Sequence, residues 1–142
     1  MKSYSPTIEP GDVIEASRNT GVGIVRYDDA RQVESFLTEL QRTASYSQRS
    51  ALSVAESLYR QMRQYGDHPE IASYIFRDML EKEQGLIIAH WQDIAQREAT
   101  CEEILHSSMS MRNTPLPIII TVSSQCRYVF PPVLQDAIFT LE

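Results

Sequence analysis

Residues 28–65 form a stretch without glycine or proline, in which apolar side chains recur every three or four positions. This spacing places them on one face of a helix. Small residues in the middle of the series would let a second helix approach closely. We therefore predict one long helix, whose buried stripe consists of Val33, Leu37, Leu40, Ala44, Ala51, Ala55, Leu58, Met62 and Tyr65.

Five serines lie between residues 43 and 57 of this stretch. Serine is a mediocre helix former, because its hydroxyl competes for backbone hydrogen bonds. The middle of the predicted helix is therefore expected to be bent or locally weak.

A second helix is predicted to follow a tight turn and to run to residue 111, antiparallel to the first. Asp67 has the position of a helix cap, Pro69 lies in the first turn, and Glu70 follows the cap by three residues. Residues 28–111 would then form a long helical hairpin.

Gly85 leaves two interpretations of the second helix open. It could end a helix at Gln84 by adopting a left-handed conformation. It could also lie inside one continuous helix, at a cost of about 1 kcal/mol. We favour the continuous helix, because the apolar spacing that starts at Ala72 recurs at Leu86 without a shift.

Both ends of the chain contain segments typical of strands. Residues 1–11 are predicted to be a flexible tail, because prolines and small polar residues dominate them. Residues 12–27 are predicted to be a β-hairpin, with Asn19 and Gly21 in positions of its turn that suit positive φ.

The C-terminal segment, residues 117–141, is predicted to add further strands. Its run Ile118-Ile119-Ile120 is apolar on both faces, as in a strand buried between two layers. A turn at residues 123–125 would lead to a second strand, and residues 133–141 would form a strand or a short helix. We predict an α+β fold, predominantly α, in which the helical hairpin packs on a small antiparallel sheet of both end segments.

The chain has 142 residues, 42% hydrophobic and 23% charged, which fits a single domain over residues 1–142. Its net charge of −6 disfavours broad binding to nucleic acid or to anionic membranes, since both require positive charge. The longest apolar run is too short to span a bilayer. We expect a cytoplasmic protein, although an uncleaved export signal in residues 3–7 remains an alternative.

Three sets of residues have the composition of reactive or binding sites. Glu98, Glu102 and His106 lie four residues apart on one helix face, where a metal site with His90 is an alternative to a solvent-exposed stripe. Cys126 precedes a cation that would activate a thiol, but a small core residue is the simpler interpretation. Cations and an aromatic that could contact single-stranded nucleic acid are Arg42, Tyr46, Arg49, Arg60 and Arg63.

The excess negative charge lies in residues 67–105, with nine acidic against three basic side chains. Unbalanced charge steers encounter with an oppositely charged partner. By contrast, carboxylates on the first helix could neutralise its arginines. We predict that the partner-binding residues are Asp78, Glu81, Glu83 and Glu102.

The sequence contains no glycine-rich phosphate loop, no nucleotide fingerprint and no catalytic serine elbow. We therefore predict a non-catalytic interaction or assembly factor (an adaptor, accessory subunit or small inhibitor) without metal or cofactor. Its partner would be a protein with a basic surface, with a homodimer as an open alternative. A small metal-dependent enzyme and a nucleic-acid accessory protein are the competing hypotheses.

Overall fold

The computed structural model describes residues 8–43, 45–65, 85–110 and 118–141. Its centre is a five-stranded sheet in which each pair of neighbouring strands is parallel, in the order β2-β3-β4-β1-β5. The strands are β1 (Gly23–Tyr27), β2 (Tyr46–Ser50), β3 (Gly85–Ala89), β4 (Ile118–Ser123) and β5 (Ile138–Leu141).

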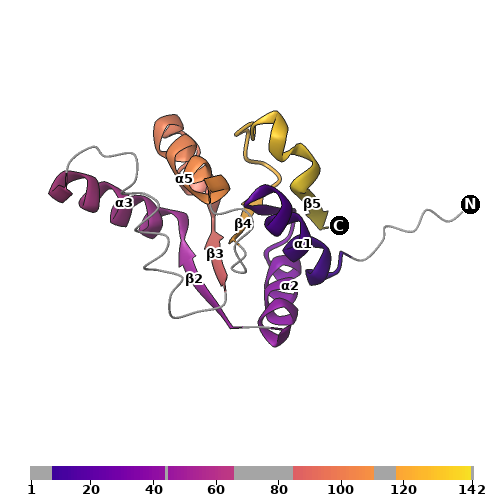
Figure 1. The fold of residues 1–142 in the computed structure, drawn as a ribbon. Coiled ribbons are helices and arrows are strands. Elements are labelled where there is room, and N and C mark those ends of the chain that lie inside the picture. The colour runs from indigo at the N-terminus through magenta and orange to yellow at the C-terminus, as the bar shows by residue number, and fades with distance from the viewer. Residues whose placement is uncertain (1–7, 44, 66–84, 111–117, 142) are drawn as a thin grey trace, which may run out of the picture.

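Helices cover both faces of this sheet (Figure 1). The helices α1 (Pro10–Thr20) and α2 (Ala30–Thr43) pack on one face, and α3 (Ala51–Tyr65) and α5 (Glu98–Ser110) pack on the other. Two short 3-10 helices, η1 (Trp91–Asp93) and η2 (Pro132–Ala137), belong to the second layer. Successive residues of the central strands point to opposite cores, so that Ile24 and Val25 of β1 contact opposite layers.

The predicted fold class is wrong, because residues 28–65 are not one helix. They form α2, then the edge strand β2, then α3. The helical spacing itself is correct within each part, since Val33, Leu37 and Leu40 are buried in α2 and Ala51, Ala55 and Leu58 in α3. These two sets pack on opposite faces of the sheet instead of on one partner helix. Ala44 and the side chains of Met62 and Tyr65 fall outside the described residues.

The prediction that a helix continues through Gly85 is also wrong. Gly85 begins β3, and all five residues of this strand are buried. The apolar run Leu86-Ile87-Ile88 is therefore a strand covered on both faces, like Ile118-Ile119-Ile120 in β4. The predicted turn at residues 67–70 and the first part of the second helix lie outside the described residues.

The predicted N-terminal β-hairpin is half wrong. Residues 10–20 are the helix α1, which starts with Pro10 in its first turn, whereas β1 coincides with the second predicted strand. Gly21 has the expected positive φ, at 97°, but it ends a helix. Its N–H donates a hydrogen bond to the carbonyl oxygen of Ser17 at 2.8 Å.

The C-terminal segment agrees with the sequence in part. The buried strand β4 and the turn after it are confirmed, but the segment predicted as a second strand, residues 126–130, has no regular structure. The last predicted element contains both alternatives, because η2 leads into β5. Strands from both ends do share one sheet, but β1 pairs with β4 and β5 in parallel.

Within the described ranges, no helix has the length and apolar character needed to cross a membrane.

Candidate functional site

The carboxyl ends of parallel strands are where open α/β sheets commonly bind ligands. In this protein a glutamine side chain connects three such ends. Gln92, which follows β3, donates through Nε2 to the hydroxyl oxygen of Tyr27 at the end of β1, at 3.1 Å. Its Oε1 accepts a hydrogen bond from the backbone N–H of Ser123 at the end of β4, also at 3.1 Å.

The connection from β1 to α2 consists of two acidic residues. The Ser124 hydroxyl donates to the Asp28 carboxylate, and the Ser124 N–H donates to the Tyr27 carbonyl oxygen at 2.8 Å. Asp29 accepts the N–H of Arg31 at 2.9 Å, at the start of α2. A phosphate loop has glycines and a lysine between strand and helix. Here carboxylates take that position, and they repel phosphate.

His90 is the residue that follows β3, and it adopts a left-handed conformation with φ of 62°. Its N–H donates to the Thr121 hydroxyl at 3.4 Å, and its side chain is exposed. His90 therefore does not lie in the second predicted helix, because the chain leaves the sheet at this residue.

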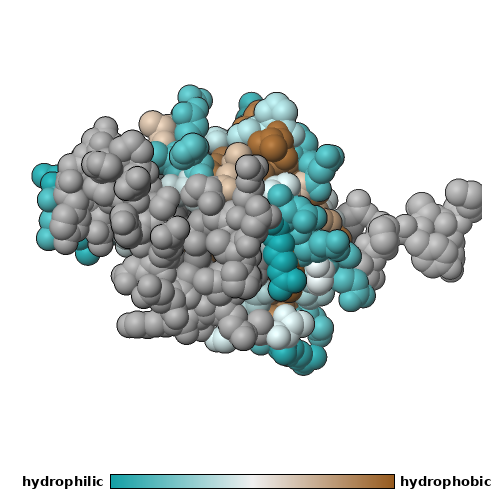
Figure 2. Space-filling view, in the orientation of Figure 1, coloured by the Kyte–Doolittle hydropathy of each residue, from teal (hydrophilic) through white to brown (hydrophobic). Residues whose placement is uncertain are grey.

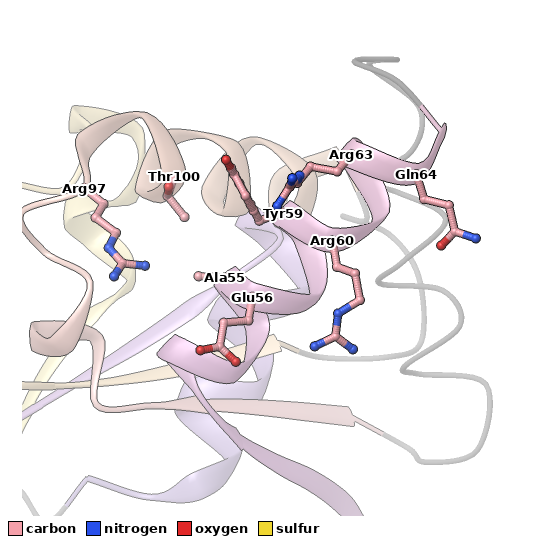
Figure 3. A pocket seen from close by; sticks show the side chains of 8 residues that line it. All are labelled: Ala55, Glu56, Tyr59, Arg60, Arg63, Gln64, Arg97 and Thr100. Atoms are coloured by element: carbon pink, nitrogen blue, oxygen red, sulfur yellow. The ribbon is translucent and has the colours of Figure 1, made fainter.

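A groove of about 510 Å³ lies between α3 and the beginning of α5. Figure 3 shows Arg97 reaching toward α3 from the segment before α5, and Tyr59 beside Arg63 on α3. Arg60 and Gln64 extend from the other side of α3. We call this site the arginine groove; its lining is Ala55, Glu56, Tyr59, Arg60, Arg63, Gln64, Arg97 and Thr100.

The arginine groove is positively charged and has an accessible aromatic ring. Tyr59 is 65% exposed, and the Arg63 guanidinium lies over its ring at 5.8 Å from the centroid. Glu56 is the acidic residue of the lining. It forms no ion pair within the described part of the chain, so the predicted neutralisation of the arginines by carboxylates of their own helix is absent at Arg60. Among the described residues, none of the three guanidinium groups has an ion-pair partner, and a guanidinium is well suited to bind an anionic ligand.

The predicted arginine side of a single long helix does not exist. Arg42 lies on α2 and pairs with Glu39 at 3.0 Å, and Tyr46 is buried in β2. Arg60 and Arg63 stay together on α3. Sequence reasoning missed Arg97 and Tyr59, although the spacing of Tyr59 and Arg63, four residues apart, is a signal for contact on a helix.

Of the predicted partner-binding residues, Glu102 is exposed on α5. Asp78, Glu81 and Glu83 lie outside the described residues, so this prediction stays untested. Glu98 and His106 are also exposed on α5. In the described ranges, no three histidine, cysteine or acidic side chains converge as metal ligands would.

The two cysteines are free thiols in different surroundings. Cys101 is buried and donates to the Ile94 carbonyl oxygen at 3.2 Å. Burial, and then the neighbouring Cys126 and Glu98, raise the pKa of Cys101 to about 12. Cys126 is half-buried. The prediction that Cys126 is a core residue is therefore correct only in part, because its half-buried side chain packs against the core without being enclosed by it.

Comparison with known proteins identifies the fold. No protein-family model and no curated protein sequence matches the chain. Solved structures do match: AMPPCP-bound DnaA from Aquifex aeolicus has a TM-score of 0.59 at 17% identity, over 92% of this chain and 44% of that one. The replication initiator DnaA bound to AMPPCP and single-stranded DNA has a TM-score of 0.60 at 16% identity, over 93% and 44%. A DNA replication initiation factor has a TM-score of 0.57 at 18% identity, over 92% and 44%.

These similarities show that this chain has the fold of part of the matched DnaA structures, and it spans less than half of their length. They contradict the predicted helical-hairpin adaptor, because the surfaces on which that function depended belong to a different architecture.

Proposed function

We propose that this domain binds single-stranded nucleic acid in the arginine groove, and that it does so without hydrolysing ATP. The observation that carries the proposal is the groove itself: arginines from two elements, without an acidic partner among the described residues, beside an exposed tyrosine. Proteins that bind single strands combine positive charge along the backbone with aromatic rings on which bases stack.

The structural likeness supports the same class of ligand. One of the similar structures is DnaA bound to AMPPCP and single-stranded DNA. The net charge of −6 argues against broad binding over the whole surface, and it confines nucleic acid to a local positive site. The groove on α3 and α5 is such a site.

A fluorescence anisotropy titration with a labelled oligonucleotide of about 15 nucleotides tests the proposal. With three arginine contacts to a single strand, affinity should fall with a log–log salt slope of about −2. Raising salt from about 50 to about 200 mM should then weaken binding roughly 20-fold.

Two variants and a matched control locate the site. Tyr59→Ala should weaken binding about 10-fold or more, because base stacking is lost. Arg63→Ala should reduce the salt slope by about 0.7. Arg31→Ala removes the same charge from an exposed position on α2, across the sheet, and should leave binding unchanged. Equal losses in Arg31→Ala and Arg63→Ala would contradict the proposed site.

Binding of an adenine nucleotide is the second candidate function. It is favoured by the likeness to AMPPCP-bound chains over most of this chain. It is disfavoured by Asp28 and Asp29 in the β1–α2 connection and by Gln92, which already bonds the ends of β1 and β4. Isothermal titration with AMPPCP and Mg²⁺ should show no saturable binding. Saturable binding that persists in Tyr59→Ala would place a nucleotide away from the groove and favour the second candidate.

We further propose that the protein acts in the cytoplasm. The free thiols of Cys101 and Cys126 support a reducing compartment. Cell fractionation tests this location.

A further inference from the structure

A second cavity, of about 640 Å³, opens at the carboxyl ends of β3 and β4. On one side it is lined by Glu98 and Glu102, which lie one turn apart on α5. On the other side it is lined by the loop that follows β4, with Arg127, Tyr128 and Val129. It is separate from the arginine groove, with which it shares no lining residue. We call it the strand-end pocket.

Tyr128 forms an aromatic wall of this pocket. Its ring packs edge-on against Trp91, at 5.8 Å between centroids, and against Phe130, at 5.0 Å. Burial raises the pKa of Tyr128 to about 12, and the neighbouring Cys101, Glu102 and Glu98 act in the same direction. The ring therefore packs on two aromatic neighbours and shares the pocket with both carboxylates.

The carboxylates of Glu98 and Glu102 form no ion pair within the described part of the chain, although Arg127 shares the pocket. The pocket therefore presents two acidic groups to one basic group, beside an aromatic ring. An extended cation with an aliphatic stem fits this set, since carboxylates bind its charged head and the ring contacts its flat or apolar surface.

The rim of the strand-end pocket includes an exposed apolar side chain. Val129, which lines the pocket, is 80% exposed. Figure 2 shows hydrophobic surface where Figure 1 places the C-terminal segment that contains η2. A free small cation would leave this rim uncovered, whereas a peptide with an aliphatic residue beside its cation would cover it.

We propose that the strand-end pocket binds a peptide segment of a partner protein, through an arginine side chain held by Glu98, Glu102 and Tyr128 with an adjacent aliphatic residue on Val129. This site is independent of the proposed nucleic-acid groove. The strand-end pocket would bind a positively charged group, whereas the arginine groove would bind a negatively charged one, and different residues line the two sites.

An NMR titration of ¹⁵N-labelled protein with the blocked peptide acetyl-Leu-Arg-amide tests the proposal. Amide shifts should concentrate in residues 125–129 and in the first turns of α5. The citrulline peptide acetyl-Leu-Cit-amide has the same shape without the charge, and it should bind at least about 10-fold more weakly. Equal binding of both peptides, or shifts elsewhere, would overturn the proposal.

Variants separate the two parts of the site. The double variant Glu98→Gln, Glu102→Gln should weaken the arginine peptide about 10-fold, and Glu34→Gln, which removes one charge from exposed α2, should not. Val129→Ser should weaken acetyl-Leu-Arg-amide about 3-fold and leave binding of arginine amide unchanged. If spermidine competes fully with the peptide and Val129→Ser has no effect, the occupant is a free polyamine, and the peptide assignment is wrong. Dispersed amide spectra verify that each variant is folded.

Discussion

Gly21 is expected to be among the least replaceable residues of the described chain. It ends α1 with a φ of 97°, a conformation that L-residues with a side chain rarely adopt. A Cβ atom at this position would lie 2.5 Å from the Met109 Cα and 2.7 Å from the Ser108 carbonyl oxygen. Both of these are backbone atoms of α5, so no side-chain rotation relieves the overlap.

The substitution Gly21→Ala should therefore be strongly destabilising. The left-handed conformation costs alanine about 1 to 2 kcal/mol. Displacing the backbone of α5 adds about 1 to 3 kcal/mol, the usual range for overpacking. A total loss of about 2 to 5 kcal/mol is a large fraction of the free energy of unfolding of a typical domain. It should lower the melting temperature by roughly 8 to 20 °C.

Urea denaturation followed by far-UV circular dichroism measures this loss, with Gly11→Ala as the matched control. Gly11 lies in the first turn of α1, and a Cβ atom there would meet nothing within 4 Å. The control should be neutral or stabilising by about 0.5 to 1 kcal/mol, because alanine is the better helix former. If the free energy of unfolding of Gly21→Ala lies within about 0.5 kcal/mol of the parent value, the close packing of the α1–β1 connection against α5 is refuted.

Two further predictions concern the core on the α3 and α5 side of the sheet. Ala51→Leu or Ala55→Leu should destabilise the protein by about 1 to 3 kcal/mol, because these alanines are 0% and 4% exposed and leave no room for a larger side chain. If both variants melt at or above the melting temperature of the parent, this packing is wrong. The raised pKa of Cys101, about 12 against 9.0, means that its contribution to stability is fully present below pH 9 and is lost as the pH rises toward 12. Between pH 7.5 and 10.5 the free energy of unfolding, measured by urea denaturation, should fall by about 2 kcal/mol more in the parent than in Cys101→Ala. Equal losses in the two proteins would contradict the raised pKa of Cys101.

The sequence predicts local burial better than it predicts the sheet. Val33, Leu37, Ala51 and Leu58 are buried as the helical spacing requires. The strand between them was missed, because an edge strand such as β2 buries little and its alternation is weak; Tyr46 is its one fully buried side chain. The serines of this region are the available sign that the helix is interrupted, but they are equally compatible with a locally weak helix.

The central strands could be recognised only in part. The isoleucines at 118–120 indicate a strand covered on both faces, and the same argument applies to residues 86–88 after Gly85. For residues 86–88 the helical interpretation was preferred instead, because the apolar spacing from Ala72 to Leu86 fits a helix, although this spacing depends on single residues far apart. Strand direction is not encoded locally, because parallel pairing depends on the crossovers between strands.

The sites could not be assembled from sequence, because their residues come from separate elements. Arg97 precedes α5 and lines the same groove as Tyr59 only because α3 and α5 pack on the same face of the sheet. Glu102 was singled out for its charge, but the residues that give it a pocket, Tyr128 and Val129, lie on a loop that was predicted to be a strand. The spacing of residues along one helix therefore reveals neither the groove shared by Arg97 and Tyr59 nor the pocket shared by Glu102 and Tyr128.

The position of β1 in the sheet determines when this protein can fold during its synthesis. The ribosome makes β1 first among the strands, yet its neighbours are β4 and β5, with Ile24 opposite Ile120 and Ile138. One side of this apolar strand therefore stays unpaired until β4 has been made, and the other side until the chain has been made to Leu141. Such an exposed strand is prone to pair with other chains. We expect the nascent protein to depend on chaperones that cover β1 until β4 and β5 have been made.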